Sequence, residues 1–225
     1  MAAKAATASI PIVFVVGLDP IAAGLVLNLN NPGGNATGMT LISHVLGPKR
    51  LELLRDILPK ASSIAMLVNP LSPDTLAEVL SVQGAAQALR VDLAMFTART
   101  QKDIQPAFNA IAQKRVDGLL IGTDPFLLDQ RAEIVAQAKR LSLPTIYPFR
   151  EYAAEGGLIS YGTNISSSYH EAGVYAGRIL KGAAPSDLPV MQPTTFQLVI
   201  NLPAAKALGL TVPPTLLARA DEVIE

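Results

Sequence analysis

The chain has 225 residues, of which 50% are apolar and 16% are charged, and its formal net charge is zero. This length can build one large α/β domain or two smaller lobes with a sizeable core. A neutral chain lacks the basic excess that nucleic acid or an anionic membrane surface attracts, so neither is expected as a partner. The absence of cysteine excludes disulfides, thiolate catalysis, cysteine zinc sites and iron–sulfur clusters.

The first apolar segment, Ile10–Val16, predicts a buried strand. It is too short to span a bilayer, which needs about 20 residues. Met1–Gly17 loosely resembles a signal peptide through Lys4 and this apolar run. However, Leu18-Asp19-Pro20 follows in place of a small-residue cleavage site. We therefore expect no export signal in the sequence as it stands.

Apolar runs of strand length alternate with amphipathic stretches of helix length. The predicted strands are Ile12–Val16, Ile64–Val68, Val91–Phe96, Gly118–Ile121, Thr145–Tyr147, Leu158–Tyr161 and Phe196–Asn201. The predicted helices lie near Ile21–Leu29, Pro48–Leu58, Asp74–Arg90, Lys102–Arg115, Leu127–Leu141, Ser168–Lys181, Pro203–Leu210 and Leu216–Ile224. Continuous apolar strands are covered on both faces, and parallel neighbours need helical crossovers. The pattern therefore predicts an α/β fold with mostly parallel, doubly wound sheets.

Proline follows a capping side chain at Asp19-Pro20, Asn69-Pro70, Ser72-Pro73 and Asp124-Pro125. A capping oxygen accepts a bond from a free backbone N–H at the helix start, and proline at the first helical position loses no hydrogen bond. Each pair therefore predicts a helix start.

Residues 12–20 and 118–125 share one pattern, an apolar strand followed by Gly-x-Asp-Pro. Such a distant repeat suits two lobes of similar fold.

Three turn-rich stretches are interpreted as crossings between the two lobes. They are Pro32–Gly38, Gly162–Asn164 and Ala184–Thr195. Glycine permits a positive φ and sharp bends, which a chain passing between lobes can use. Three crossings would make a hinged molecule.

Residues for catalysis or for a cofactor are missing from the sequence. Neither His44 nor His170 has a partner at a spacing that would orient a general base, and no metal-binding histidine pair occurs. The nucleophile-elbow, phosphate-loop and dinucleotide fingerprints are also absent. Asp19 and Asp124 could oppose each other like a pair of glycosidase acids, but helix capping explains each of them first. We therefore predict no enzyme, no metal and no cofactor.

Ligands of open α/β sheets bind beyond the carboxyl ends of the strands. The candidate ligand-binding residues at these places are Asp19, Pro20, Asn69, Thr123, Asp124, Phe126, Tyr147, Tyr161 and Thr163. Helix N-termini can hold a carboxylate, and aromatic rings can wall a cleft for a small molecule. Capping or core packing explains any single one of these residues, so the prediction depends on their convergence.

Several segments together resemble a known family. They are Ile10-Pro11-Ile12-Val13-Phe14, residues 31–38 (NPGGNATG), residues 48–54 (PKRLELL), Val68-Asn69-Pro70, residues 122–126 (GTDPF), residues 156–162 (GGLISYG) and Leu198-Val199-Ile200-Asn201. In this combination, which covers essentially the whole chain, the sequence resembles the ABC transporter substrate-binding family that includes tryptophan/tyrosine transport components.

The resemblance implies a periplasmic-binding-protein type I fold, with two Rossmann/flavodoxin-like lobes, parallel sheets and a small-molecule ligand between the lobes. From the strand–helix alternation and the three crossings, we expect residues 1–40 and 163–186 in the first lobe, and 41–162 and 187–225 in the second. The resemblance further implies delivery to a membrane permease, a periplasmic or lipid-anchored location and, in some members, an aromatic amino acid as the ligand.

Family members usually begin with a signal peptide and a further segment that supplies the first strands of lobe one. We therefore expect an incomplete first lobe here. An unfinished sheet leaves an edge strand and apolar surface to cover, which favours a homo-oligomer.

Two other functions remain as alternatives. One is a ligand-sensing regulatory module of the same fold, although no basic helix-turn-helix precedes Ile10. The other is a flavodoxin-like enzyme, for which no motif is present.

Overall fold

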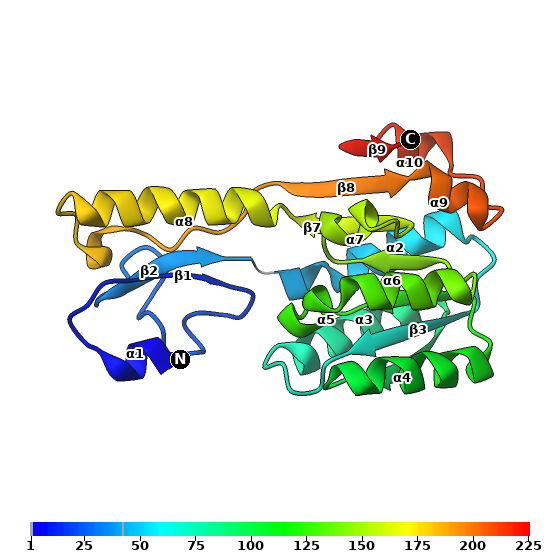
Figure 1. Ribbon diagram of the computed structural model, residues 1–225, viewed down its shortest axis with the longest axis horizontal. Helices are drawn as coiled ribbons and strands as arrows, with labels where there is room; N and C mark the ends of the chain where they lie inside the picture. The colour runs from blue at the N-terminus through cyan, green and yellow to red at the C-terminus, as the bar shows by residue number, and fades with distance from the viewer. Residues whose placement is uncertain (1, 42) are drawn as a thin grey trace. The chain divides into compact units, whose positions relative to one another are not determined.

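The computed structural model describes residues 2–41 and 43–225 and divides the chain into two compact units (Figure 1). Unit 1 consists of Met1–Ile42 and Thr163–Thr195. Unit 2 consists of Ser43–Gly162 and Phe196–Glu225. Each unit has buried apolar clusters of its own, and the largest one belongs to unit 2.

Seven strands of the described residues form one sheet in the order β4-β3-β5-β6-β7-β8-β9. Their bounds are β3 Ser63–Val68, β4 Asp92–Thr97, β5 Gly118–Ile121, β6 Thr145–Tyr147, β7 Ile159–Thr163, β8 Phe196–Asn201 and β9 Glu222–Ile224. The pairs from β4 to β7 are parallel, as is the pair β8 and β9. The N–H of Asn201 at the end of β8 donates to the carbonyl of Leu158, just before β7 (2.9 Å), so these two strands run in opposite directions.

Helices cover both faces of this sheet. They are α2 Gly47–Ile57, α3 Thr75–Leu89, α4 Gln101–Lys114, α5 Pro125–Asp129, α6 Arg131–Arg140, α7 Arg150–Ala154, α9 Leu202–Ala207 and α10 Pro214–Leu217. Ile64, Met66 and Val68 of β3 join one apolar cluster with α2 and α3. Ala65 and Leu67 are also fully buried, and successive side chains of a strand point to opposite faces. Both faces of β3 are therefore covered, which explains its unbroken apolar run.

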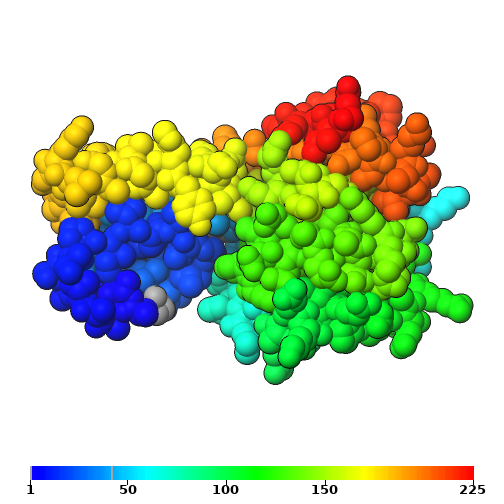
Figure 2. Space-filling view, viewed as in Figure 1, coloured from blue at the N-terminus to red at the C-terminus, as the bar shows by residue number. Residues whose placement is uncertain are grey.

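Unit 1 contains a small parallel sheet of β1 Ile12–Val16 and β2 Ala36–Thr40. Helix α8, Ile165–Leu180, packs on both strands, as the yellow and blue segments of this unit show in Figures 1 and 2. The unit also holds α1 Ala2–Ala6, the 3-10 turn η2 Pro185–Asp187 and a bridge between Met39 and Met191. A Cβ at Gly38 would overlap the carbonyl of Phe14, so glycine allows β1 and β2 to approach each other.

Three sequence predictions, one of a crossing and two of whole helices, are wrong. The stretch Pro32–Gly38 is not a crossing, because it lies inside unit 1 and leads into β2. Strand β2, with the sequence ATGMT, lacks the long apolar run that signals a strand, although all five residues are buried. No helix forms at Ile21–Leu29, because one turn ends at Gly24, whose φ is +67°.

The third wrong prediction is the final helix, Leu216–Ile224. Helix α10 ends at Leu217, and β9 follows it. The carboxylate of Asp221 accepts a bond from the N–H of Leu198 (2.7 Å), and the N–H of Asp221 donates to the carbonyl of Leu198 (2.9 Å). These two bonds hold the end of the chain against β8 as a strand, and local periodicity cannot reveal them.

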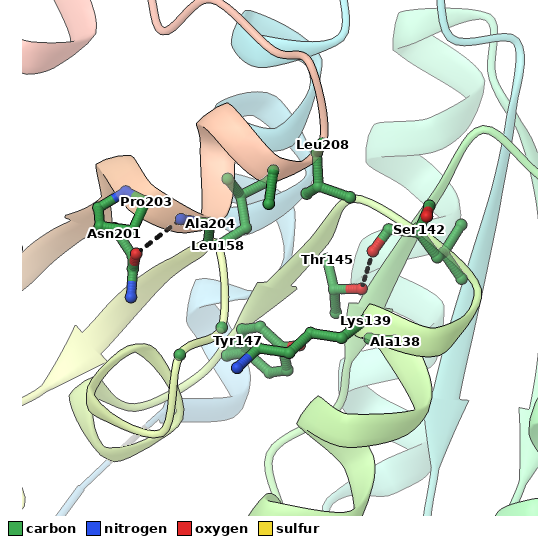
Figure 3. Close-up of a pocket in the computed structure, with 14 residues that line it drawn as sticks. Ala138, Lys139, Ser142, Thr145, Tyr147, Leu158, Asn201, Pro203, Ala204 and Leu208 are labelled. Carbon is green, nitrogen blue, oxygen red and sulfur yellow. Dashed lines mark hydrogen bonds between the residues drawn. The ribbon is translucent and has the colours of Figure 1, made fainter.

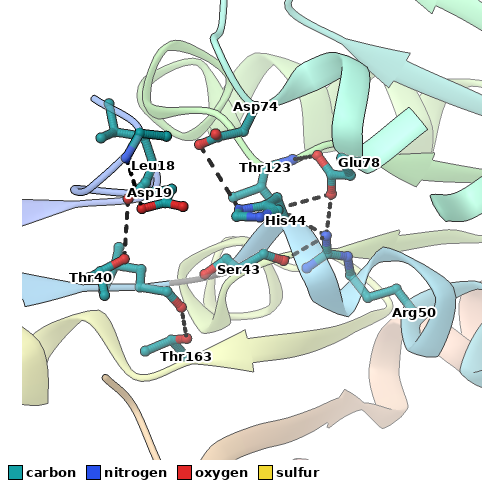
Figure 4. A network of polar contacts seen from close by, with 12 residues as sticks. Leu18, Asp19, Thr40, Ser43, His44, Arg50, Asp74, Glu78, Thr123 and Thr163 are labelled. Atoms are coloured by element: carbon teal, nitrogen blue, oxygen red, sulfur yellow. Dashed lines mark hydrogen bonds and ion pairs between the residues drawn. The ribbon is translucent and has the colours of Figure 1, made fainter. Parts of the chain in front are cut away.

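One buried ion pair links α2 to α3 inside unit 2 (Figure 4). The side chains of Arg50 and Glu78 are 0% and 2% exposed, and Arg50 Nη2 donates to Glu78 Oε1. Arg50 also donates to the carbonyls of Ser43 (3.3 Å) and Tyr161 (3.5 Å). Burial lowers the pKa of Arg50, while the Glu78 carboxylate opposes that shift. Arg50 therefore joins α2, α3, β7 and the 3-10 turn η1, Ser43–Leu46, through one guanidinium group.

Replacing Arg50 should destabilise unit 2 strongly. We expect Arg50→Met to lower the free energy of unfolding by about 3–5 kcal/mol, because Glu78 would remain buried without its cation. Lys49→Met is the matched control; it removes an exposed pair with Glu52 and should change stability by about 1 kcal/mol or less. Urea unfolding followed by circular dichroism measures both. The double variant Arg50→Met/Glu78→Met should recover part of the loss, and a double variant less stable than Arg50→Met would contradict this account.

A second polar link joins the starts of β3 and β5. The Asp117 carboxylate accepts from the backbone N–H groups of Ser62 (2.7 Å) and Ser63 (3.0 Å). These bonds stabilise the ionised carboxylate and lower the pKa of Asp117. Its stabilising effect is therefore present above the pKa of the unfolded chain and is lost as the pH falls through the folded-state value.

Asp117→Asn should therefore change how the free energy of unfolding depends on pH in the acidic range. We expect the wild-type chain to be the more stable of the two at neutral pH. The difference in the free energy of unfolding should shrink below about pH 4, as Asp117 becomes protonated. Unfolding free energies measured from pH 7 down to the acid transition test this. A gap that stays constant across the whole range would show that the Asp117 charge is not involved.

Candidate ligand-binding site

The carboxyl ends of β3 and β5 lie side by side in unit 2, where Leu67 pairs with Ile121. Asn69 follows β3, and Asp124 follows β5. Asn69 Nδ2 donates to Asp124 Oδ2 (3.2 Å), while Asp124 Oδ1 accepts from the N–H of Leu127 (3.0 Å). Asp124 is thus the N-cap of α5, as the sequence predicts, and its second oxygen joins the two strand ends.

Thr123 is held by the Arg50–Glu78 ion pair. Its backbone N–H donates to Glu78 Oε2 (2.9 Å), and its hydroxyl donates to Glu78 Oε1 (3.0 Å). The same hydroxyl accepts from Arg50 Nη2 (2.9 Å; Figure 4). The turn that carries Thr123 and Asp124 is therefore fixed by groups that come from two helices.

Asn69-Pro70 and Ser72-Pro73 do not begin a helix as predicted. The Asn69 side chain accepts from the N–H of Leu71 (3.0 Å), and the Asn69 carbonyl accepts from the hydroxyl of Thr75 (2.6 Å). Asn69 therefore stabilises a turn, and α3 starts only at Thr75. The structure assigns Asn69 to the link with Asp124 and to this turn.

Two aromatic residues of the predicted set remain partly accessible near these strand ends. Phe126 lies in α5 and is half-buried. Tyr161 of β7 is also half-buried, and its ring centroid lies 6.2 Å from that of Phe196. The Tyr161 carbonyl accepts from Arg50, so its backbone belongs to the same polar group as Thr123.

Tyr147 is placed differently from the other two. Only 1% of this residue is exposed, and its ring stacks on Tyr152 with the centroids 4.8 Å apart. Burial raises the pKa of Tyr147 well above its usual value. The Tyr147 ring is therefore part of the protein interior, covered by α7.

The other three predicted residues belong to unit 1. Asp19 is exposed, and its carboxylate accepts from the N–H groups of Ile21 (2.8 Å) and Ala22 (3.2 Å). Pro20 is buried. Thr163 is also buried, and its hydroxyl donates to the carbonyl of Leu41 (3.0 Å), next to the end of β2. Asp19 thus caps a single turn and not the predicted helix.

Thr163 also borders a polar pocket of about 210 Å³ within unit 1. Its lining comes from the end of β2, the first turns of α8 and residues 191–195. Asn164 caps α8 by accepting from the N–H of Ser167 (3.0 Å). Hydroxyl groups and one carboxylate, Glu171, therefore dominate this pocket.

Arg50 and Glu78 are not among the residues predicted from the sequence. A signal exists in hindsight: Arg50 shares the buried stripe of α2 with Leu51, Leu54 and Ile57, and Glu78 shares that of α3 with Val82. Opposite charges inside the apolar stripes of consecutive helices indicate a buried pair, because a lone buried charge is strongly disfavoured.

The candidate residues of unit 2 combine fixed hydrogen-bonding groups with two half-buried aromatic residues, Phe126 and Tyr161, which suits binding. Residues 2–41 and 43–225 contain no group of three or more potential metal-ligating side chains. Within the same ranges, no helix is long and apolar enough to cross a membrane. His44 Nδ1 lies 4.0 Å from the Asp74 carboxylate.

Comparisons with known proteins agree with this fold. A protein of Clostridioides difficile strain R20291 named tyrosine-binding protein is 27% identical over 209 residues, which are 93% of this chain and 60% of that protein. The chain thus spans about 60% of the length of this curated relative.

Two solved structures match almost the whole chain. A conserved domain protein of Vibrio cholerae has a TM-score of 0.88 at 32% identity, over 99% of this chain and 74% of the other. A domain of Streptococcus pneumoniae solved in complex with L-Trp has a TM-score of 0.86 at 25% identity, over 98% and 74%. These matches confirm the predicted periplasmic-binding-protein type I fold. Because the model of the ABC transporter substrate binding protein family matches residues 1–224, this chain belongs to that family.

Proposed function

We propose that the chain is the solute-binding part of an ABC importer component, and that it binds an aromatic amino acid without catalysis. The observation that carries this proposal is the group at the carboxyl edge of unit 2. There the buried Asp124 carboxylate and Asn69 amide bond to each other, and the half-buried Phe126 is two residues from Asp124. The half-buried Tyr161 is linked to Thr123 through Arg50. Family membership supports binding as the activity.

The chemistry of this edge fits an amino acid. Asp124 keeps carboxylate lone pairs beyond the two bonds that it accepts, and these can receive an ammonium group. The N-terminus of α5 begins at the same residue, but that helix has only five residues and therefore adds little by itself. Phe126 and Tyr161 can pack on an aromatic side chain. The names of the relatives, one called a tyrosine-binding protein and one solved with L-Trp, point to the same ligand class.

The proposed contact residues in unit 2 are Asn69, Thr123, Asp124, Phe126 and Tyr161. Tyr147 is not among them, because its ring is buried and stacks on Tyr152 of α7. Asp19, Pro20 and Thr163 of unit 1 stay predictions from the sequence, as do the lobe boundaries and the homo-oligomer. The proposal includes an extracytoplasmic location and delivery of the ligand to a membrane permease.

Removing either aromatic ring should weaken ligand binding. We expect L-tyrosine or L-tryptophan to bind the purified chain in isothermal titration calorimetry, and Phe126→Ala or Tyr161→Ala to reduce affinity by about 2- to 12-fold through lost ring packing. Tyr169→Ala, which removes an exposed ring of α8, is the control and should leave affinity unchanged. If neither amino acid binds, the proposed ligand class is wrong. If one binds but Phe126→Ala and Tyr161→Ala both bind it like the wild type, these two rings are not ligand contacts.

Asp124→Asn separates a binding role from a capping role. Asparagine caps a helix about as well as aspartate, so thermal stability should change little. If the carboxylate meets the ligand ammonium, affinity should fall by about tenfold or more, because charge-assisted hydrogen bonds are the strong ones. Calorimetry and thermal unfolding on the same sample give both values. A variant that keeps both its stability and its affinity would assign Asp124 to capping alone.

A further inference from the structure

A pocket of unit 2, with a volume of about 420 Å³, lies away from the candidate ligand residues (Figure 3). Thr145 begins β6 and Leu158 precedes β7, so the pocket is at the amino ends of these strands. The candidate residues follow the carboxyl ends of β3 and β5, at the opposite edge of the same sheet. Tyr147 is the one residue of the predicted ligand set that borders this pocket.

The walls of this pocket are mostly apolar. Figure 3 shows Pro203, Ala204 and Leu208 of the α9 region on one side and Ala138 and Lys139 of α6 on the other. Leu143 and Ala207 also line it, among 14 residues in total. Its volume falls within the range of about 300–1,000 Å³ that is typical of small-molecule sites. The size and lining suit a small apolar molecule.

Two of the neutral polar side chains in the pocket, Thr145 and Asn201, already have protein partners. The Thr145 hydroxyl donates to the carbonyl of Leu143 (2.8 Å). The Asn201 side chain accepts from the N–H of Ala204 (2.9 Å) and donates to the carbonyl of Ala153 (3.1 Å). These groups therefore stabilise the walls and leave little hydrogen-bonding demand for a polar ligand.

Lys139 is the exception. Its ammonium nitrogen lies 3.4 Å from the carbonyl of Glu155, and in residues 2–41 and 43–225 it has no carboxylate within 4.0 Å. The carboxylate of Glu155 lies instead 3.9 Å from Arg131. An apolar pocket with one uncompensated cation at its wall is complementary to an apolar molecule that carries one negative charge.

Two glycines keep this geometry possible. A Cβ at Gly157 would lie 2.5 Å from Cε2 of Tyr147, and a Cβ at Gly156 would overlap the Lys139 ammonium. Gly156 also has a φ of +97°, which side chains rarely adopt. The Gly156-Gly157 turn therefore lets Lys139 and the Tyr147 ring lie against the backbone and bound the pocket.

We propose that this pocket is a second ligand site, distinct from the amino-acid site, and that it takes a small apolar carboxylate. The apolar body would occupy the space between α6 and α9 and be removed from water. The carboxylate would pair with Lys139. This proposal does not depend on the identity of the ligand at the carboxyl edge.

Octanoate is the probe, titrated into the purified full chain by calorimetry. We expect saturable binding at one site. Ala207→Trp, at an exposed position of α9 that lines the pocket, should abolish it by filling the space while the chain stays folded. Lys139→Met keeps an apolar side chain and should lower the affinity for octanoate by about two- to fivefold, because an exposed ion pair contributes this much. The affinity for octan-1-ol, which has no charge, should not change. Lys206→Met, on α9 but outside the lining, is the matched control and should bind octanoate like the wild type.

Competition with L-tyrosine distinguishes this proposal from the proposed function. Excess L-tyrosine should leave octanoate binding unchanged. Displacement by L-tyrosine would mean that octanoate occupies the amino-acid site, which would overturn the second site and leave the first intact. Absence of octanoate binding, or full binding in a folded Ala207→Trp chain, would also overturn it. Equal octanoate affinity in Lys139→Met and wild type would show that Lys139 does not pair with the carboxylate.

Discussion

The buried pair of Arg50 and Glu78 is the interaction on which the architecture of unit 2 and its candidate site both depend. Two charges without water are stable only when they are paired and their remaining hydrogen-bonding groups are occupied. Here main-chain atoms of Ser43, Tyr161 and Thr123 and the Thr123 hydroxyl bond to the two Nη atoms of Arg50 and to Glu78, while Arg50 Nε is buried without a hydrogen bond among the described residues. The pair therefore fixes the ends of β5 and β7 relative to α2 and α3, at the edge where a ligand would bind.

The parallel sheet separates two kinds of surface. At the carboxyl ends of β3 and β5, the chain turns into loops that present polar groups, such as Asn69 and Asp124. At the amino ends of β6 and β7, helices α6 and α9 leave an apolar space with Lys139 at its wall. The amino-acid site and the carboxylate pocket that we propose therefore lie at opposite edges of the sheet, because one follows the carboxyl ends of strands and the other the amino ends.

The helix start at Asp124-Pro125 was predicted from the sequence, because capping acts between close neighbours in the chain. Asp124 is the N-cap of α5, as its position before Pro125 indicates. The surroundings of Tyr147 and Asn69 were not predicted, because they depend on side-chain packing and turn geometry and not on periodicity. Tyr147 stacks on Tyr152, and the Asn69 carbonyl accepts from the Thr75 hydroxyl.

The sequence by itself determined the α/β class, the buried strands β3 and β5 and most helices, because apolar periodicity and capping are local properties. It also indicated the family through short motifs spread along the whole chain. Only the tertiary structure decided that residues 36–40 form β2, that the chain ends in β9 and that Arg50 meets Glu78. Each of these features depends on a partner far away in the sequence, and no local pattern encodes which distant groups the folded chain brings together.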